Sequence, residues 1–200
     1  MPSIRNREVN LIPQWNQQGG LPPIDDNRPA DPERSPYPVT VEQVVARFAT
    51  SLERCAVLDG FLRHRSELHR IGLHQGFQWL DGSFMENIEI LESRAPNDMD
   101  VVSFVYLDDA AIDQMNHDDL RFLVDNDWVK QNFKVDSYAV SLLDDPENLV
   151  QQSAYWYSMW SHRRTKQWKG FLKVDLNPIF DQAAIILLDA KKQEILHEQN

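Results

Sequence analysis

Eight of the eleven prolines in this chain of 200 residues lie within the first 38 residues. Proline lacks a backbone N–H, fixes φ and restricts the residue before it, so this density disfavours helices and central strands. We therefore divide the chain into a proline-rich arm without regular structure, residues 1–38, and a globular domain, residues 39–200. The arm could pack on the domain or remain a floppy tail. Packing would rely on its apolar residues, which are Leu11, Ile12, Trp15, Leu21, Ile24 and Tyr37.

The composition is that of an ordinary globular protein, with 42% hydrophobic and 26% charged residues. A net charge of −11 argues against long nucleic acids and anionic membranes as partners, because both attract basic surfaces. The single cysteine, Cys55, excludes an internal disulfide and a cysteine-rich zinc site. No apolar run reaches membrane-spanning length, and the N-terminus lacks the apolar core of a signal peptide. We therefore predict a cytoplasmic protein.

Hydrophobic periodicity and turn residues predict alternating helices and strands after the arm. Thr40 and Gln43 fit a capping box, with Gly60 as the candidate break in the helix that follows. The expected elements are a helix over 40–68, a strand over 77–81, one or two helical turns within 84–91, a strand over 98–107, a helix over 110–126, a strand over 133–142, a helix over 145–160, a strand over 168–176 and a last helix from 177. This order predicts an α/β (α+β) domain with a small mixed sheet flanked by helices.

A turn and a pair of carboxylates give the strongest chemical signal in the sequence. Gly82 permits a sharp turn, and Ser83 adds a hydroxyl beside a backbone amide, which together suit phosphate oxygens. Asp98 and Asp100 are two residues apart on an expected strand, so they point to one face about 7 Å apart. Such carboxylates repel each other unless a cation lies between them, and magnesium is typically held by one or two carboxylates plus substrate phosphates. The alternative is an acidic strand start in a solvated loop.

A magnesium site for phosphoryl or nucleotidyl transfer usually includes a third carboxylate from a neighbouring strand. Asp136 is the first candidate, because its neighbours Val135 and Ser137 would face the opposite side of their strand. Asp175, at the end of the strand expected over 168–176, is the second candidate. The sequence leaves the choice between them open.

Gly82-Ser83, a spacer of fourteen residues, and Asp98-Met99-Asp100 followed by apolar residues resemble the signature of the nucleotidyltransferase superfamily. This is the fold of DNA polymerase beta and of the small antitoxin nucleotidyltransferases. Over about residues 11–172 the chain also resembles a family of bacterial and phage nucleotidyltransferase-like proteins. The positions that carry this wider resemblance are Leu21-Pro-Pro23, Arg47-Phe48, Arg54, Asp81-Gly-Ser-Phe84, Pro96-Asn-Asp98-Met-Asp100, Tyr155-Trp156, Arg164 and Lys169-Gly170.

The resemblance implies a role for each residue of the motif. Gly82 and Ser83 would contact the terminal phosphates of a nucleoside triphosphate. Asp98 and Asp100 would bind two Mg²⁺ ions. The third carboxylate, with Asp136 as first choice, would activate the acceptor hydroxyl or bind the catalytic metal. The expected catalytic and metal-binding residues are therefore Asp98, Asp100 and Asp136.

The densest basic cluster of this acidic chain comprises Arg163, Arg164, Lys166 and Lys169. Arginine forks match phosphate oxygens, so the cluster could neutralise a triphosphate, and the alternative is a solvated turn. By their positions in the resembling family, Arg164 and Lys169 are the expected nucleotide contacts. The aromatic run 155–160 is expected to pack in the core rather than to stack on a nucleobase.

These features predict a magnesium-dependent nucleotidyltransferase that moves a nucleoside monophosphate from a nucleoside triphosphate to a hydroxyl acceptor. The charge of −11 favours a partner protein over a long nucleic acid as acceptor. The resembling antitoxins modify a partner toxin, which suggests a toxin–antitoxin or phage-defence role. The alternative is a degenerate transferase fold that binds a nucleotide or a partner protein without catalysis.

Overall fold

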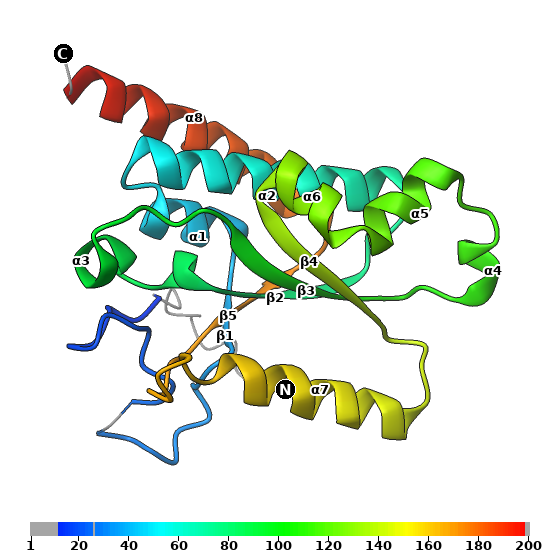
Figure 1. Ribbon diagram of the computed structural model, residues 1–200, viewed down its shortest axis with the longest axis horizontal. Helices are drawn as coiled ribbons and strands as arrows, with labels where there is room; N and C mark the ends of the chain where they lie inside the picture. The colour runs from blue at the N-terminus through cyan, green and yellow to red at the C-terminus, as the bar shows by residue number, and fades with distance from the viewer. Residues whose placement is uncertain (1–11, 26, 199–200) are drawn as a thin grey trace, which may run out of the picture.

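A computed structural model describes residues 12–25 and 27–198 (Figure 1). Its five strands form one mixed sheet in the order β1-β5-β2-β3-β4. They are β1 (Tyr37–Val39), β2 (Gly76–Asp81), β3 (Met99–Val105), β4 (Val135–Ser141) and β5 (Leu172–Asp175). β2 is antiparallel to both of its neighbours, β5 and β3, whereas β1 is parallel to β5 and β4 is parallel to β3. The predicted α/β class with a small mixed sheet is confirmed.

Helices cover both faces of the sheet, so the molecule has three layers (Figure 1). α1, α2, α5, α6 and α8 lie on one face, and α7 lies on the other. The helices are α1 (Val41–Phe48), α2 (Leu52–Arg70), α3 (Ile88–Glu92), α4 (Asp109–Ile112), α5 (His117–Val124), α6 (Asn126–Phe133), α7 (Pro146–Trp160) and α8 (Asp181–Glu198). Two short 3₁₀ helices complete the described fold, η1 (Ser83–Met85) and η2 (Pro178–Phe180).

The first predicted helix is two helices, and the predicted break near Gly60 is wrong. The capping box of Thr40 and Gln43 is present and starts α1. The break falls after Phe48, because the Ser51 side chain caps α2 by accepting from the Arg54 amide. Gly60 lies inside α2, where a Cβ would come within 1.9 Å of the Phe133 carbonyl oxygen. This glycine therefore serves close packing of α2 against the end of α6.

Capping also divides the helix predicted over 110–126. Asp108 and Asn116 accept from backbone amides at the starts of α4 and α5. Asp125 caps α6, which lies in a segment for which the pattern predicted no element. The strands predicted over 98–107, 133–142 and 168–176 are all present but shorter, as β3, β4 and β5.

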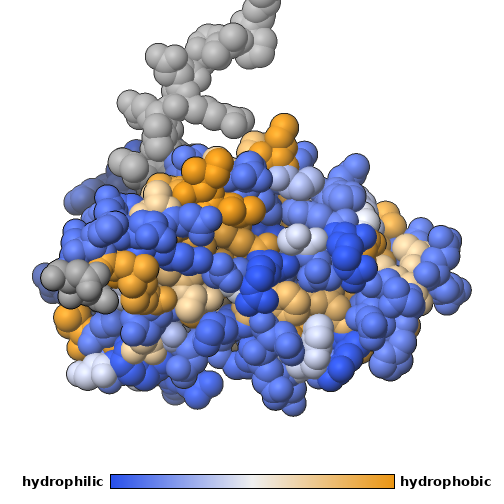
Figure 2. Space-filling model, turned by 90° about the horizontal axis from the view of Figure 1, so that it is seen from above, coloured by the Kyte–Doolittle hydropathy of each residue, from blue (hydrophilic) through white to orange (hydrophobic). Residues whose placement is uncertain are grey.

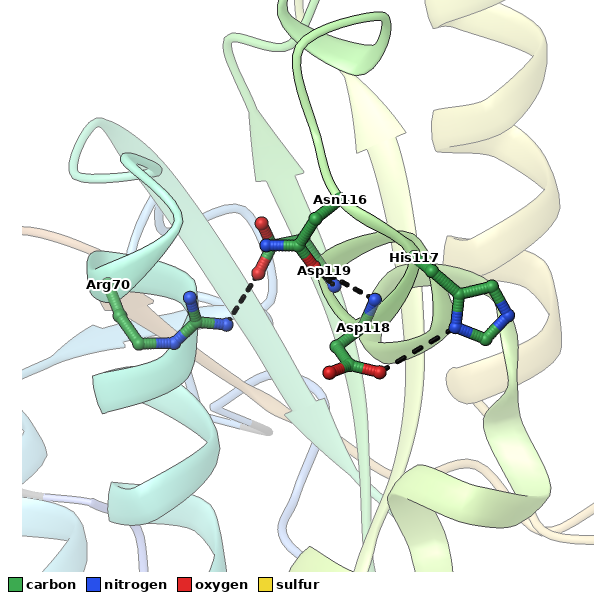
Figure 3. Close-up of a pocket in the computed structure, with 5 residues that line it drawn as sticks. All are labelled: Arg70, Asn116, His117, Asp118 and Asp119. Carbon is green, nitrogen blue, oxygen red and sulfur yellow. Dashed lines mark hydrogen bonds and ion pairs between the residues drawn. The ribbon is translucent and has the colours of Figure 1, made fainter.

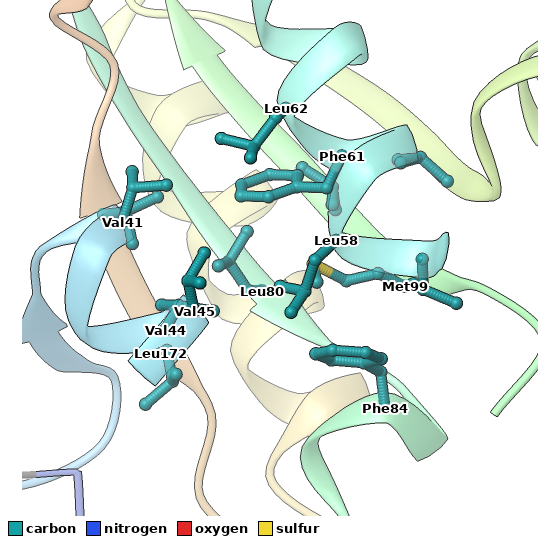
Figure 4. Packing of buried hydrophobic residues seen from close by; sticks show 14 of the residues in the cluster. Val41, Val44, Val45, Leu58, Phe61, Leu62, Leu80, Phe84, Met99 and Leu172 are labelled. Atoms are coloured by element: carbon teal, nitrogen blue, oxygen red, sulfur yellow. The ribbon is translucent and has the colours of Figure 1, made fainter. Parts of the chain in front are cut away.

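A large hydrophobic core fills the layer between the sheet and α1, α2 and α8 (Figure 4). The labelled members from α1 and α2 are Val41, Val44, Val45, Leu58, Phe61 and Leu62. Those from the sheet and η1 are Leu80, Phe84, Met99 and Leu172. A smaller aromatic core lies on the α7 face of the sheet, where Trp156, Trp160 and Phe171 pack with Trp79 and Phe104. The two cores fix which strand residues face each layer.

The described part of the arm packs on the domain. Trp15 Nε1 donates to the Met85 carbonyl at 2.7 Å, and Leu21 is fully buried. The Leu21 carbonyl accepts from the Gly170 amide at 2.7 Å. Regular structure begins earlier than predicted, because residues 37–39 form β1 at the sheet edge. Leu11, one of the expected anchors, lies outside the described residues.

The face formed by the larger helical layer is mainly hydrophilic, with hydrophobic side chains gathered in small separate patches (Figure 2). Exposed apolar residues of α8 include Ile185 and Ile186. Over the ranges 12–25 and 27–198, no helix combines the length and apolar character needed to cross a membrane.

Candidate active site

Three aspartates form a row across the sheet. The register pairs Asp81 of β2 with Asp100 of β3, and Asp100 with Asp136 of β4. Residues directly opposite each other in neighbouring strands point to the same face, and such strands lie about 4.8 Å apart. The next row of the register, Trp79 and Val102, belongs to the aromatic core under α7. The carboxylates therefore lie on the α7 face, and we call this set the acid row.

Asp98 joins the acid row through a lysine. It lies immediately before β3, and its Oδ2 is 2.9 Å from Nζ of Lys130 on α6. The same Nζ lies 3.4 Å from Asp136 Oδ2. One ammonium therefore bridges the carboxylate that precedes β3 and the carboxylate of Asp136 in β4. The structure brings together Asp98, Asp100 and Asp136, the three residues for which the sequence predicts catalysis and metal binding.

Asp175, the other candidate for the third carboxylate, lies elsewhere. It ends β5 and is exposed, opposite Phe77 at the start of β2, whereas Asp81 is at the end of β2. Its Oδ1 accepts from the Asn177 amide at 2.7 Å, in the turn that leads to η2. Its carboxylate therefore has a local structural role, at the end of β2 opposite to Asp81.

The acid row is electrostatically strained at its centre. Burial raises the pKa of Asp100 to about 7, and the carboxylates of Asp81, Asp98 and Asp136 add to the rise. Burial also raises the pKa of Asp81, although the Lys169 ammonium opposes the rise. Asp81 Oδ1 is buried without a hydrogen-bond partner. A site with these properties favours an additional positive charge.

The Gly82-Ser83 turn lies against the centre of the row. Gly82 has φ +87°, and a Cβ there would be 3.0 Å from both Cγ and Oδ2 of Asp100. Only glycine combines this conformation with so close an approach. Ser83 is half-buried and begins η1. The turn therefore contacts the acid row through Gly82, and Ser83 follows it directly in the chain.

Arg54 of α2 fixes the segment that follows the turn. Its guanidinium is buried and donates to the carbonyls of Phe84 and Glu86 at 2.8 and 2.7 Å. Its Nε donates to Glu89 Oε1 at 2.6 Å. These bonds hold η1 and α3 against α2, which keeps Gly82 in place next to Asp100.

Lys169 and Arg164, the two expected nucleotide contacts, have different surroundings. Lys169 is buried, with Nζ 2.8 Å from Asp81 Oδ2 and 3.3 Å from Glu86 Oε1. Burial lowers the pKa of Lys169, but the two carboxylates outweigh this and raise it overall. In this structure Lys169 is therefore a counter-ion of Asp81 rather than a free phosphate ligand. Arg164 is exposed on the adjacent loop and makes no ion pair with any described residue.

Sequence reasoning did not single out Asp81 as an acid of the site, nor Lys130. Asp81 could have been found from its position, since it follows Trp79 at the two-residue spacing of one strand face and precedes the glycine turn. Lys130 has no local signal, because it reaches Asp98 and Asp136 only when α6 packs beside β4.

Aromatic side chains continue the site beyond the acid row. Tyr138 lies opposite Val102 in the register, and its ring is 4.8 Å from that of Trp156 on α7. Trp156 and Trp160 are buried, as expected for core packing, whereas Tyr155 and Trp168 are exposed. Aromatic rings therefore border the acid row along the strands on the α7 face of the sheet.

A separate surface hollow of about 330 Å³ lies between the end of α2 and the start of α5 (Figure 3). Its polar groups largely satisfy one another. Arg70 pairs with Asp119 at 2.7 Å, and Asn116 Oδ1 accepts from the amides of Asp118 and Asp119. Arg70 precedes β2, whereas Asp81 ends it, so the hollow is at the opposite end of the sheet from the acid row.

In the part of the chain that the structure describes, no three His, Cys, Asp or Glu side chains already form a metal-ligand group. Two lysine ammonium groups contact the carboxylates of the site: Lys130 contacts Asp98, and Lys169 contacts Asp81. The donor set still suits Mg²⁺, since it consists of carboxylate oxygens on two adjacent strands and one segment end.

Comparison with known proteins gives one match. The family described as "Family of unknown function (DUF6932)" matches residues 13–175, a range that holds most of the described arm, the acid row and Lys169. No curated protein and no solved structure matches the chain. Because the match covers most of its length, the chain belongs to the DUF6932 family of unknown function.

Proposed function

We propose that the protein is a magnesium-dependent nucleotidyltransferase. The observation that carries the proposal is the acid row, in which Asp100 and Asp136 are paired in register and Gly82-Ser83 packs against Asp100. This combination supports the resemblance to the nucleotidyltransferase superfamily seen in the sequence. Converging carboxylates can hold the metal ions that clamp the attacking and leaving oxygens in phosphoryl and nucleotidyl transfer, and a turn beside them offers donors for phosphate oxygens.

Asp98, Asp100 and Asp136 would hold the metal ions. The fit rests on oxygen donors alone, on the burial and neighbouring carboxylates that raise the pKa of Asp100 to about 7, and on the unpartnered Oδ1 of Asp81. Bound Mg²⁺ would neutralise phosphate charge and help to ionise the acceptor hydroxyl. Asp136 is the residue best placed to orient that hydroxyl, because it lies on the edge strand of the sheet.

In the proposed reaction, the acceptor oxygen forms a bond to the α-phosphorus of a nucleoside triphosphate, and the bond to pyrophosphate breaks. The hydroxyl proton leaves to a carboxylate or to water, and pyrophosphate departs. Ser83 would contact the terminal phosphates from the turn. Arg164 would also contact these phosphates. It lies near the acid row, because the neighbouring Arg163 pairs with Glu86, and Glu86 pairs with the lysine that contacts Asp81.

The acceptor that fits best is a hydroxyl on a partner protein. The net charge of −11 disfavours a long nucleic acid, whose phosphates need a basic surface. A toxin–antitoxin or phage-defence role would follow from such an acceptor.

The second candidate function is nucleotide or protein binding without catalysis. Lys130 and Lys169 favour it, because they already pair with three of the four carboxylates around the turn. A degenerate transferase fold could retain these pairs and need no metal.

The experiment is calorimetric titration of ATP, GTP, CTP and UTP into the wild type and into Asp98→Asn/Asp100→Asn, with and without Mg²⁺. Asp175→Asn is the matched control, because it changes an aspartate at the other end of the sheet. We expect magnesium-dependent binding of at least one triphosphate to the wild type and the control, and at least a tenfold loss in the double variant. Binding that is independent of Mg²⁺ and of both aspartates would favour the non-catalytic function. Equal magnesium-dependent binding by all three proteins would refute the site.

A further inference from the structure

Lys130 occupies a special position among the ion pairs of the chain. Some pairs join residues three or four apart on one helix, such as Arg63 with Asp59, and others join distant segments, as Lys169 does with Asp81. Lys130 extends from α6 to Asp98 before β3 and to Asp136 in β4. Its ammonium therefore lies between two carboxylates from different parts of the sheet, where a bound cation would also lie.

Lys130 and Asp136 are only six residues apart, so the local chain geometry favours their contact. α6 ends at Phe133, and Lys134 adopts a left-handed conformation that turns the chain directly into β4. Lys130 is therefore one helical turn before the strand that carries Asp136. The Lys130 side chain is 43% exposed, so it can leave the carboxylates for water without unpacking the core.

We propose that Lys130 is a positioning residue that holds Asp98 and Asp136 together in the absence of metal and is displaced when a divalent cation binds. The inference rests on the proposed function, because it requires a cation site at the acid row. A lysine suits this role, since its ammonium is a compact point charge on a flexible stem and forms no rigid bidentate pair. Before metal binds, it offsets the repulsion between the two carboxylates. Once displaced, its charge is free to meet the phosphates of a substrate.

The experiment measures the affinity for Mn²⁺ alone, from the electron paramagnetic resonance signal of the free ion. Mn²⁺ prefers oxygen ligands, as Mg²⁺ does. We compare the wild type with Lys130→Met, which keeps the apolar stem and removes the charge, and with Lys130→Arg, which keeps the charge. Lys191→Met is the control for net charge, because Lys191 pairs with Glu194 on the surface of α8, away from the acid row.

We expect Lys130→Met to bind Mn²⁺ at least tenfold more tightly than the wild type, because the competing charge is gone. Lys191→Met should stay within threefold of the wild type, and Lys130→Arg, which keeps a charge that pairs with carboxylates, should bind Mn²⁺ no more tightly than the wild type. In EDTA, Lys130→Met should unfold at a lower temperature than Lys191→Met, and saturating Mn²⁺ should abolish that difference. This second result separates a positioning role from a merely structural one, which metal would not replace.

Two failures are distinguishable. If the wild type binds Mn²⁺ and Lys130→Met binds it equally or more weakly, the role of Lys130 is refuted and the metal site stands. If neither protein binds Mn²⁺, or if Asp98→Asn/Asp100→Asn retains full affinity, the proposed metal site itself falls and the inference falls with it.

Discussion

Asp100 lies at the centre of the acid row, where burial and three neighbouring carboxylates raise its pKa from 3.8 to about 7. Between about pH 4 and pH 7, Asp100 is therefore protonated in the folded protein and ionised in the unfolded chain. The free energy of unfolding falls as the pH rises through this window. Asp100→Asn removes the effect. We expect the variant to match the wild type near pH 4 and to exceed it by roughly 2–4 kcal/mol at pH 8.

Urea unfolding in EDTA at both pH values measures this difference. Asp175→Asn is the matched control, and its stability should follow that of the wild type at both values. Parallel pH profiles for Asp100→Asn and the wild type would contradict the electrostatic account of the acid row.

Lys169 is the second residue whose environment makes a sharp prediction. Its side chain is only 7% exposed and lies between Asp81 and Glu86. Lys169→Met leaves these carboxylates buried without their shared ammonium, and we expect a loss of about 3–5 kcal/mol in the free energy of unfolding. Urea denaturation measures it. Adding Asp81→Asn to Lys169→Met should restore part of the loss. A cost below about 1 kcal/mol is what an exposed ion pair would give, and it would contradict the buried pairing.

Among the elements, those with strong local patterns were predictable. β2, β3 and β4 follow from short apolar runs bounded by turn residues, and α7 follows from the cap at Asp145. β1 was not predictable, because its three residues follow a run of prolines and form a strand only by pairing with β5. α6 was missed because its apolar residues are few and its cap, Asp125, directly follows α5.

The site was predictable in part for the same reason. Two short motifs supply four of its residues, Gly82, Ser83, Asp98 and Asp100, and the fourteen-residue spacer between the motifs can be read directly from the sequence. Asp136 joins them through the β3–β4 register, which no local pattern fixes, so the sequence left Asp136 and Asp175 as alternatives. The burial of Lys169 and the contacts of Lys130 depend on packing between distant elements, which a single sequence does not encode in any short motif.

α2, α8 and β2 are joined by one buried ion network. Arg65 of α2 donates from Nε and Nη2 to the Asp181 carboxylate at the start of α8, and from Nη1 to Gln78 Oε1 of β2 at 2.7 Å. Asp181→Ala leaves the buried guanidinium without its carboxylate, and we expect a loss of about 3–5 kcal/mol. Chemical denaturation measures it. Asp189→Ala on the exposed side of α8 is the control and should change stability by less than about 0.5 kcal/mol. Equal effects of the two variants would show that this network does not hold α8.

At the scale of the molecule, the described arm belongs to the domain. β1 pairs with β5, Leu21 is fully buried, and the family match begins at residue 13. A chain lacking residues 1–39 would expose the edge of β5, and unpaired edges template association between chains. We expect this form to aggregate or to lose cooperative unfolding, as measured by light scattering and urea denaturation. A chain lacking only residues 1–11 is the control. A monodisperse form of unchanged stability after removal of 1–39 would contradict this account.

The gradient of exposure along the acid row bears on the size of an acceptor. The Asp81 side chain is 4% exposed, whereas that of Asp136 is 27% exposed and lies on the edge strand β4. The buried Lys169 ammonium covers the Asp81 end of the row, and the Asp136 end faces water. A group attached to a bulky molecule can therefore approach Asp136 laterally, without threading into a chamber. Under the proposed function, surface contacts rather than an enclosing pocket would therefore select the acceptor at this end of the row.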